Sequence, residues 1–123
     1  MAYPDYPEEW EFISFFEAEP SHIDPIEVVP WFYNGPTYET QRDGYSIKFA
    51  LNPASCQFEL EILCNGNPFV LLSGERIESM KITTLQSTEK MVITFEERGP
   101  PYLLDLVLQL KPVVSVTWGT ERS

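Results

Sequence analysis

From residue 45 onward, hydrophobic and polar side chains alternate along short segments that are separated by turn residues. Such alternation places every second side chain on one face, which is typical of a half-buried β-strand. It predicts strands over 45–51, 57–62, 69–72, 76–85, 91–96, 104–110 and 114–118, and an eighth over 37–42. Because no stretch of helical periodicity separates these segments, neighbouring strands are expected to be antiparallel.

Turn residues follow the predicted strands at regular spacing. Asn52-Pro53-Ala54-Ser55 and Asn65-Gly66-Asn67-Pro68 are two such turns, and Arg98-Gly99-Pro100-Pro101 is a third. Asn-Gly is a strong hairpin signal because both residues tolerate positive φ. One hydrophobic face per strand favours two layers around one core. The sequence therefore predicts a mainly β, single-domain fold over residues 1–123, an antiparallel β-sandwich or a curved meander of about seven to eight strands.

The segment ahead of the strands predicts a short N-terminal helix over 7–17. Pro7 suits the first helical position, and the two glutamates that follow it suit the positive end of the helix dipole. Pro20 is expected to stop this helix. The expected buried face consists of Glu9, Phe12, Ile13 and Phe16. A strand over 12–16 is the competing interpretation, because aromatic residues favour strands, and we prefer the helix.

Residues 21–36 are rich in proline and are expected to form an extended segment that wraps around the sheet, anchored by Ile26, Val28 and Trp31. The same segment carries the densest aromatic cluster, in which alternation sends Trp31 and Tyr33 to one side. Exposed Trp and Tyr side chains form binding platforms for sugars or for partner proteins. A place in the core, or a lid over it, is the ordinary alternative for such a cluster.

Charge is distributed unevenly along the chain. The net charge is −11; residues 1–43 hold ten acids against one base, a net −9, and the remaining 80 residues carry only −2. The same 43 residues hold ten of the seventeen aromatic residues. An acidic surface repels nucleic-acid phosphates and anionic membranes, so neither is expected as a partner. It attracts and orients a basic protein, although acidity that serves only solubility is the plainer interpretation.

The predicted partner-binding residues lie in this acidic, aromatic segment, where aromatic side chains would supply desolvated anchors and carboxylates would steer association. They are Glu17, Glu19, Asp24, Glu27, Trp31 and Tyr33.

Residue types that support catalysis or metal binding are sparse. His22, the sole histidine, is flanked by acids but has no nucleophile placed near it by a sequence motif, so a surface-loop role is favoured over acid–base catalysis. The four acids of the predicted partner-binding set do not follow a calcium-loop pattern. Glu59 and Glu61 share one face of a regular strand, which predicts a solvent-facing position rather than a pair of catalytic carboxylates. No cofactor, metal site or enzymatic activity is predicted.

The two cysteines, Cys56 and Cys64, are eight residues apart in a strand-like segment. An extended chain separates them by roughly 26 Å, too far for a disulfide, so both are predicted to be reduced core residues. The first residues do not resemble a signal peptide, and no hydrophobic stretch approaches membrane-spanning length. We therefore expect a cytoplasmic location.

In its size and acidity the chain is similar to bacterial toxin-neutralising immunity proteins and nuclease inhibitors, a similarity of class and charge that assigns no individual residue. Our main hypothesis is a non-enzymatic module that binds a basic protein. The alternative is a β-sandwich that binds carbohydrate or another small ligand through Trp31 and Tyr33. The oligomeric state is open, and a dimer formed through an exposed edge strand is one arrangement that the sequence allows.

Overall fold

The computed structural model describes residues 6–20, 35–96 and 105–118. Within them, one helix, α1 (Glu9–Phe16), precedes eight strands. The strands are β1 (Thr37–Arg42), β2 (Tyr45–Asn52), β3 (Gln57–Cys64), β4 (Asn67–Gly74), β5 (Ile77–Leu85), β6 (Thr88–Phe95), β7 (Leu106–Lys111) and β8 (Ser115–Trp118). The predicted mainly β architecture is confirmed.

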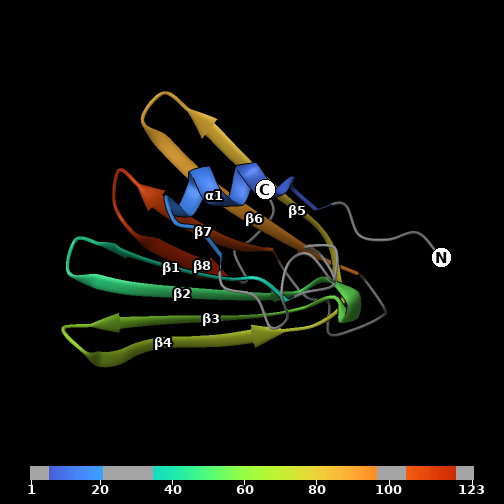
Figure 1. The fold of residues 1–123 in the computed structure, drawn as a ribbon, viewed down its shortest axis with the longest axis horizontal. Coiled ribbons are helices and arrows are strands. Elements are labelled where there is room, and N and C mark those ends of the chain that lie inside the picture. The colour runs from blue at the N-terminus through green and yellow to red at the C-terminus, as the bar shows by residue number, and fades with distance from the viewer. Residues whose placement is uncertain (1–5, 21–34, 97–104, 119–123) are drawn as a thin grey trace.

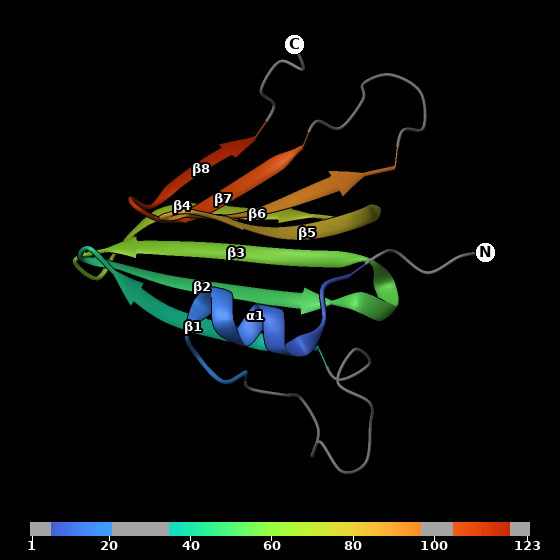
Figure 2. The ribbon, with the colours of Figure 1, turned by 90° about the horizontal axis from the view of Figure 1, so that it is seen from above.

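The strands form two antiparallel sheets of four, each of which is a simple meander. The orders are β1-β2-β3-β4 and β5-β6-β7-β8, and Figures 1 and 2 show these sheets as two layers. Helix α1 contacts both β1 and β5, so it covers the side of the molecule where these two edge strands lie. Since β1 pairs with β2 over six residues, the acidic N-terminal segment contributes a strand to the first sheet.

Tight turns with positive φ close two of the three hairpins of the first sheet. Asn65 and Gly66 have φ values of 53° and 81° between β3 and β4, as the Asn-Gly signal predicts. Asp43 and Gly44 adopt the same conformation between β1 and β2, at 52° and 82°. Between β2 and β3 the turn is a short 3-10 helix, Pro53–Ser55.

The inner faces of both sheets meet in one hydrophobic core. The predicted alternation holds in β2, β3, β6 and β7, whose inward side chains are buried; these are Ile47, Phe49, Leu51, Phe58, Leu60, Ile62, Met91, Ile93, Phe95, Leu106, Leu108 and Leu110. Aromatic contacts join the two sheets, because the ring of Phe58 lies 5.9 Å from that of Phe95 and 6.0 Å from that of Trp118. The core is therefore continuous between the layers.

Two sequence-based details of the fold are corrected. Pro7 lies one residue ahead of the N-cap, Glu8, so it is not the first helical residue. The cysteines are free, as predicted, but both are half-buried instead of belonging to the core. Cys56 caps the 3-10 helix with φ 58°, outside the strand in which the alternation placed it.

Candidate partner-binding surface

Helix α1 begins where two glutamates cap each other. The Glu8 side chain accepts from the backbone N–H of Glu11, and the Glu8 backbone N–H donates to Oε1 of Glu11 at 2.9 Å. This reciprocal pair satisfies donors that the helix leaves unpaired, and the acids in the first turn favour the positive end of the dipole. The helix ends at Glu17, which adopts the left-handed conformation at φ 55°. The capping pair thus fixes which residues become helical.

The buried face of α1 is aromatic. Phe12, Phe15 and Phe16 are at most 2 % exposed. The ring of Tyr38 stacks on Phe12 at 5.4 Å and on Phe16 at 5.2 Å, and Phe16 stacks on Phe49 at 5.7 Å. The predicted face included Ile13, which is only half-buried, and omitted Phe15. Burying these rings against β1 and β2 determines which side of the helix faces outward.

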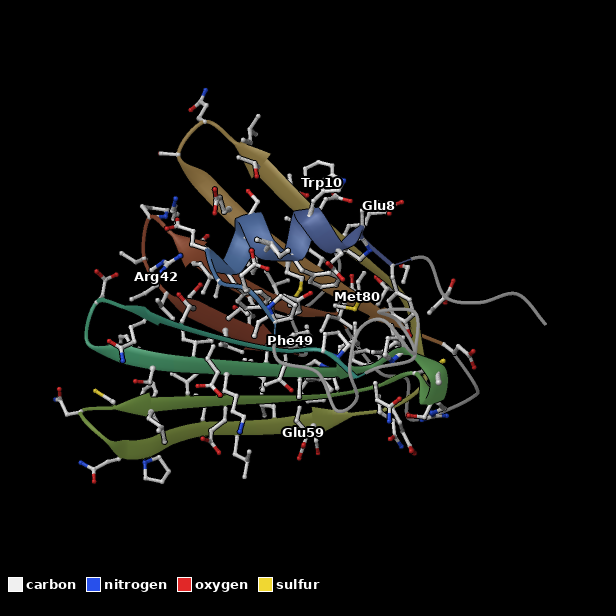
Figure 3. All side chains as sticks on the ribbon, in the orientation of Figure 1. Glu8, Trp10, Arg42, Phe49, Glu59 and Met80 are labelled. Atoms are coloured by element: carbon white, nitrogen blue, oxygen red, sulfur yellow. The ribbon has the colours of Figure 1, made fainter. Side chains whose placement is uncertain are left out.

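The outward side of α1 carries an exposed tryptophan among carboxylates. We call it the α1 surface and define it by its exposed residues, Glu8, Trp10, Ser14, Glu17 and Glu19. Trp10 is 67 % exposed. Figure 3 shows Trp10 and Glu8 on the side of α1 that faces away from Phe49. A large aromatic side chain that is exposed to solvent beside charged groups is typical of an anchor residue in a protein–protein interface.

Glu17, one of the predicted partner-binding residues, is held within the molecule. Its Oε1 lies 2.9 Å from Nζ of Lys111 and 3.3 Å from Nη2 of Arg42. Arg42 also donates to the carbonyl oxygen of Phe16 at 3.4 Å, and Lys111 approaches Glu89 at 3.8 Å. This ion-pair cluster (Glu17, Arg42, Glu89, Lys111) joins the end of α1 to β1, β6 and β7.

The cluster shifts the titration of its members. The hydrogen-bonded ion pair with Lys111, followed by the charge of Arg42, lowers the pKa of Glu17. The same bond to Glu17, followed by the charge of Glu89, raises the pKa of Lys111. Glu17 therefore remains ionised at neutral pH, and its two cationic neighbours fix its position and offset its charge, so it adds little to the negative potential of the α1 surface.

Glu19, the second predicted residue within the described part of the chain, is exposed. Its charge acts on Tyr38, which is fully buried beneath the helix. Burial, and then the charges of Glu9 and Glu19, raises the pKa of Tyr38. The Tyr38 hydroxyl has no hydrogen-bond partner among the described residues. Tyr38 is thus neutral at physiological pH and serves as packing for α1.

The other predicted site residues, Asp24, Glu27, Trp31 and Tyr33, lie outside the described residues, as do His22 and the expected anchors of the wrapping segment. Their roles in protein or carbohydrate binding stay predictions. Trp10 was not among the predicted site residues. The signal that identifies it is its position in the helical pattern, opposite the Phe12 and Phe16 stripe.

The outer face of the first sheet, away from the core, is mainly polar on β1, β2 and β3. An open groove of about 620 Å³ there is lined by residues of all four strands, including Thr37, Asn52, Glu59, Ser73 and Glu75. Figure 3 shows Glu59 on this side of the molecule, far from Trp10. The described lining contains no exposed aromatic side chain. Without such a platform, the groove gives no support to sugar binding.

Two further features bear on chemistry at the surface. Within the described ranges, no three His, Cys, Asp or Glu side chains are grouped closely enough to hold a metal ion. Across the same part of the chain, no helix has the length and hydrophobicity needed to span a membrane.

Comparison with known proteins identifies a structure with a similar fold. No protein-family model matches the sequence, and no curated protein sequence is significantly similar to it. The structure is similar to a chain of a contact-dependent growth inhibition toxin–immunity protein complex from Klebsiella pneumoniae 342. The TM-score is 0.77 with 16 % sequence identity, and the match covers 97 % of this chain and 98 % of that chain. At this identity the likeness concerns the fold.

Proposed function

We propose that this chain is a non-enzymatic, immunity-type protein that binds a basic protein partner through the α1 surface. The observation that carries the proposal is the exposed Trp10 of an acidic helix, set on a fold that matches, over nearly its whole length, a chain from a toxin–immunity protein complex. A fold alone does not assign a function, so the argument depends on the chemistry of the surface.

The chemistry of the α1 surface favours a cationic protein. The carboxylates of Glu8 and Glu19 are exposed on the same surface as Trp10, Glu17 being held in its ion pairs, and the whole chain carries −11. Long-range attraction of this kind raises the association rate, while a desolvated tryptophan supplies affinity. The predicted residues Asp24 and Glu27 would extend the same negative region. Nucleic acid and anionic membranes are not proposed as partners because their charge has the same sign.

Of the two roles in a toxin–immunity pair, the immunity role suits this composition. Binding and covering a partner requires complementary charge and anchors, and it requires no catalytic group. The chain has a single histidine, and its acidic side chains on the described surfaces occupy solvent-facing or ion-paired positions. We further propose that the protein acts in the cytoplasm, where it would meet a toxin that has entered the cell.

The test is capture of the partner with a pair of charge variants. Glu8→Ser/Glu19→Gln removes two charges from the α1 surface, and serine retains the helix cap. Glu59→Gln/Glu75→Gln removes two charges from the outer face of the first sheet and is the matched control. We expect low-salt capture from a native lysate to yield a stoichiometric basic protein, released by salt, that the first variant loses and the control retains.

Growth then tests the immunity role itself. Expression of the captured protein alone should arrest a bacterial host, and co-expression of this chain should restore growth. Equal capture by both variants would reject the α1 surface as the docking site. A captured protein that is harmless when expressed alone would reject the immunity role, even if the binding surface were correct.

A further inference from the structure

The four edge strands of the two sheets differ in how they are protected from pairing with other chains. An edge strand presents unpaired backbone N–H and C=O groups, which another strand can bond unless charge, coverage or shortness prevents it. Strands β1 and β5 carry charged side chains and both contact α1. Strand β8 is only four residues long. Within the part of the chain that the structure describes, β4 has none of these protections, since it is eight residues long, has no charged side chain and ends its sheet.

The exposed side of β4 is hydrophobic. Phe69 is 65 % exposed, and its ring lies 5.8 Å from that of Tyr45; Leu71 is 69 % exposed and, opposite Glu61, points to the outer face of the sheet. On the inner face, Val70 and Leu72 are only half-buried against the core. A neighbouring strand beside β4 would therefore cover hydrophobic side chains on both faces of the sheet, besides pairing the free backbone groups.

Features that discourage pairing are confined to the hairpin end of β4. Pro68 has no N–H to donate, and the β3–β4 ladder is irregular between Ile62 and Leu63. Phe69 has no partner on β3, and beyond it the segment 70–74 pairs regularly with β3, from Val70 opposite Ile62 to Gly74 opposite Phe58. Among the described residues, a regular, uncharged stretch of five residues is thus left unpaired on the open side of β4.

We propose that β4 pairs antiparallel with β4 of a second copy of this chain, joining the two β1–β4 sheets into one. A two-fold axis normal to the sheet at Leu71 places Leu71 opposite the second copy's Leu71 and Val70 opposite the second copy's Leu72. Outer-face residues then meet outer-face residues. This register uses the strand from Pro68 to Gly74.

The charge distribution favours a second copy over a basic protein at this edge. Nothing on β4 attracts a cation, so the partner of the α1 surface gains no electrostatic advantage here. Nor does the high net charge prevent self-pairing, because Glu75 lies beyond the end of β4, and the carboxylates nearest Leu71, Glu59 and Glu61, lie on β3. Three strand spacings separate them from their copies, roughly 14 Å, beyond the screening length of about 8 Å at physiological salt.

The dimer is expected to be weak. One regular edge of five residues, with two exposed hydrophobic side chains per copy, covers less surface than a standard stable interface. We therefore expect a dissociation constant between about 10 μM and 1 mM.

Sedimentation velocity over protein concentrations from about 5 μM to about 500 μM brackets this range and tests the proposal. The wild-type mass should rise with concentration from 14.2 kDa toward twice that value. Leu71→Lys places two lysines directly opposite each other and should keep the protein monomeric. Leu85→Lys is the matched control, since Leu85 is also 69 % exposed but lies at the end of β5; it should dimerise as the wild type does.

A charge swap and hydrogen exchange make the test specific to the strand edge. Leu71→Glu alone should be monomeric, and mixing it with Leu71→Lys should restore a dimer through opposite charges at the axis. Backbone amides of 69–74 should exchange more slowly at high than at low concentration. A wild type that stays monomeric, a dimer that survives Leu71→Lys, or a mixture that stays monomeric would overturn the proposal.

Discussion

Helix α1 buries one face and strand β4 half-buries one, and both expose a large hydrophobic side chain, yet their surroundings differ. Trp10 on α1 is 67 % exposed among carboxylates, whereas Phe69 on β4 is 65 % exposed on a strand without charge. Equal exposure therefore does not mean equal function. Because the charge around an exposed aromatic residue selects its partner, the proposed partners differ: a basic protein for α1 and a second copy for β4.

The buried faces of the two elements also differ, and this difference gives the largest expected effect. Phe16 is fully buried and stacks on both Tyr38 and Phe49. Phe16→Ala should lower the free energy of unfolding by about 3–5 kcal/mol, as measured by chemical denaturation. Leu71→Ala on the exposed face of β4 should change it by less than about 0.5 kcal/mol. Similar losses for the two variants would contradict the described packing of α1.

The inner side of β4 is tightly packed where the strand ends, in contrast to its open outer side. A Cβ added at Gly74 would lie 2.6 Å from Cε1 of Phe58 and 3.4 Å from Cε1 of Phe95. Gly74→Ala should therefore destabilise the protein by about 1–3 kcal/mol, because the buried Phe58 ring has to move. Ser73→Ala, one residue earlier on the exposed face, is the control and should have little effect. A neutral Gly74→Ala variant would show that the end of β4 is loosely packed.

Beneath α1, removal of the unpaired hydroxyl of Tyr38 is expected to have a smaller effect on stability, and to raise it. The hydroxyl is buried and has no partner among the described residues, so folding removes it from water without compensation. Tyr38→Phe should retain the ring stack and raise the free energy of unfolding by up to about 1 kcal/mol. The check is a denaturation midpoint that moves to higher denaturant with an unchanged slope. A clear loss of stability would mean that the hydroxyl has a bonding partner.

Substitution of Glu17 is expected to have the smallest effect on stability, and the pH dependence of that effect identifies its cause. Because the pKa of Glu17 is lowered in the folded protein, its contribution to stability is present above its usual value of 4.5 and is lost as the pH falls through the folded pKa. Because the pKa of Lys111 is raised, the contribution of the ion pair to stability is retained up to a pH above 10.5. Glu17→Gln should lower the Tm by a few degrees at most near neutral pH, since the pair is partly exposed.

The difference in Tm between wild type and Glu17→Gln should disappear at acid pH, where the carboxyl is protonated in both the folded and the unfolded protein. Glu59→Gln removes the same charge from the outer face of β3 and should not reproduce this pattern. A difference that stayed constant from acid to neutral pH would show that Glu17 acts through its left-handed backbone conformation at the helix end and not through its charge.

The strands could be predicted well because each carries its own signal. The alternation of Leu106, Leu108 and Leu110 is local, and so is the turn at Asn65-Gly66. The ends of α1 and its buried face were harder to predict, because more than one set of aromatic and aliphatic residues fits a stripe along the helix. Tyr38, 22 residues beyond Phe16, decides between them by stacking on Phe12 and Phe16, and this contact has no local signal.

The candidate site could be predicted in part. The concentration of acids in the first 43 residues located the region, and Glu17 and Glu19 lie on the α1 surface. That Glu17 is ion-paired depends on Lys111, far along the chain, and could not be read from its neighbours. The exposed edge of β4 likewise depends on the order of strands in the sheet, which shows that three other edges are charged, covered or short.

Binding of the captured basic protein to two single variants tests the central claim most directly. Trp10→Ala and Phe69→Ala each remove an aromatic side chain of nearly equal exposure, one from the α1 surface and one from β4. Titration calorimetry with each variant should show an affinity that is weaker by about 30-fold or more for Trp10→Ala, as for an interface anchor, and unchanged for Phe69→Ala. An unchanged affinity for Trp10→Ala, or a loss for Phe69→Ala alone, would contradict the assignment of the partner to the α1 surface.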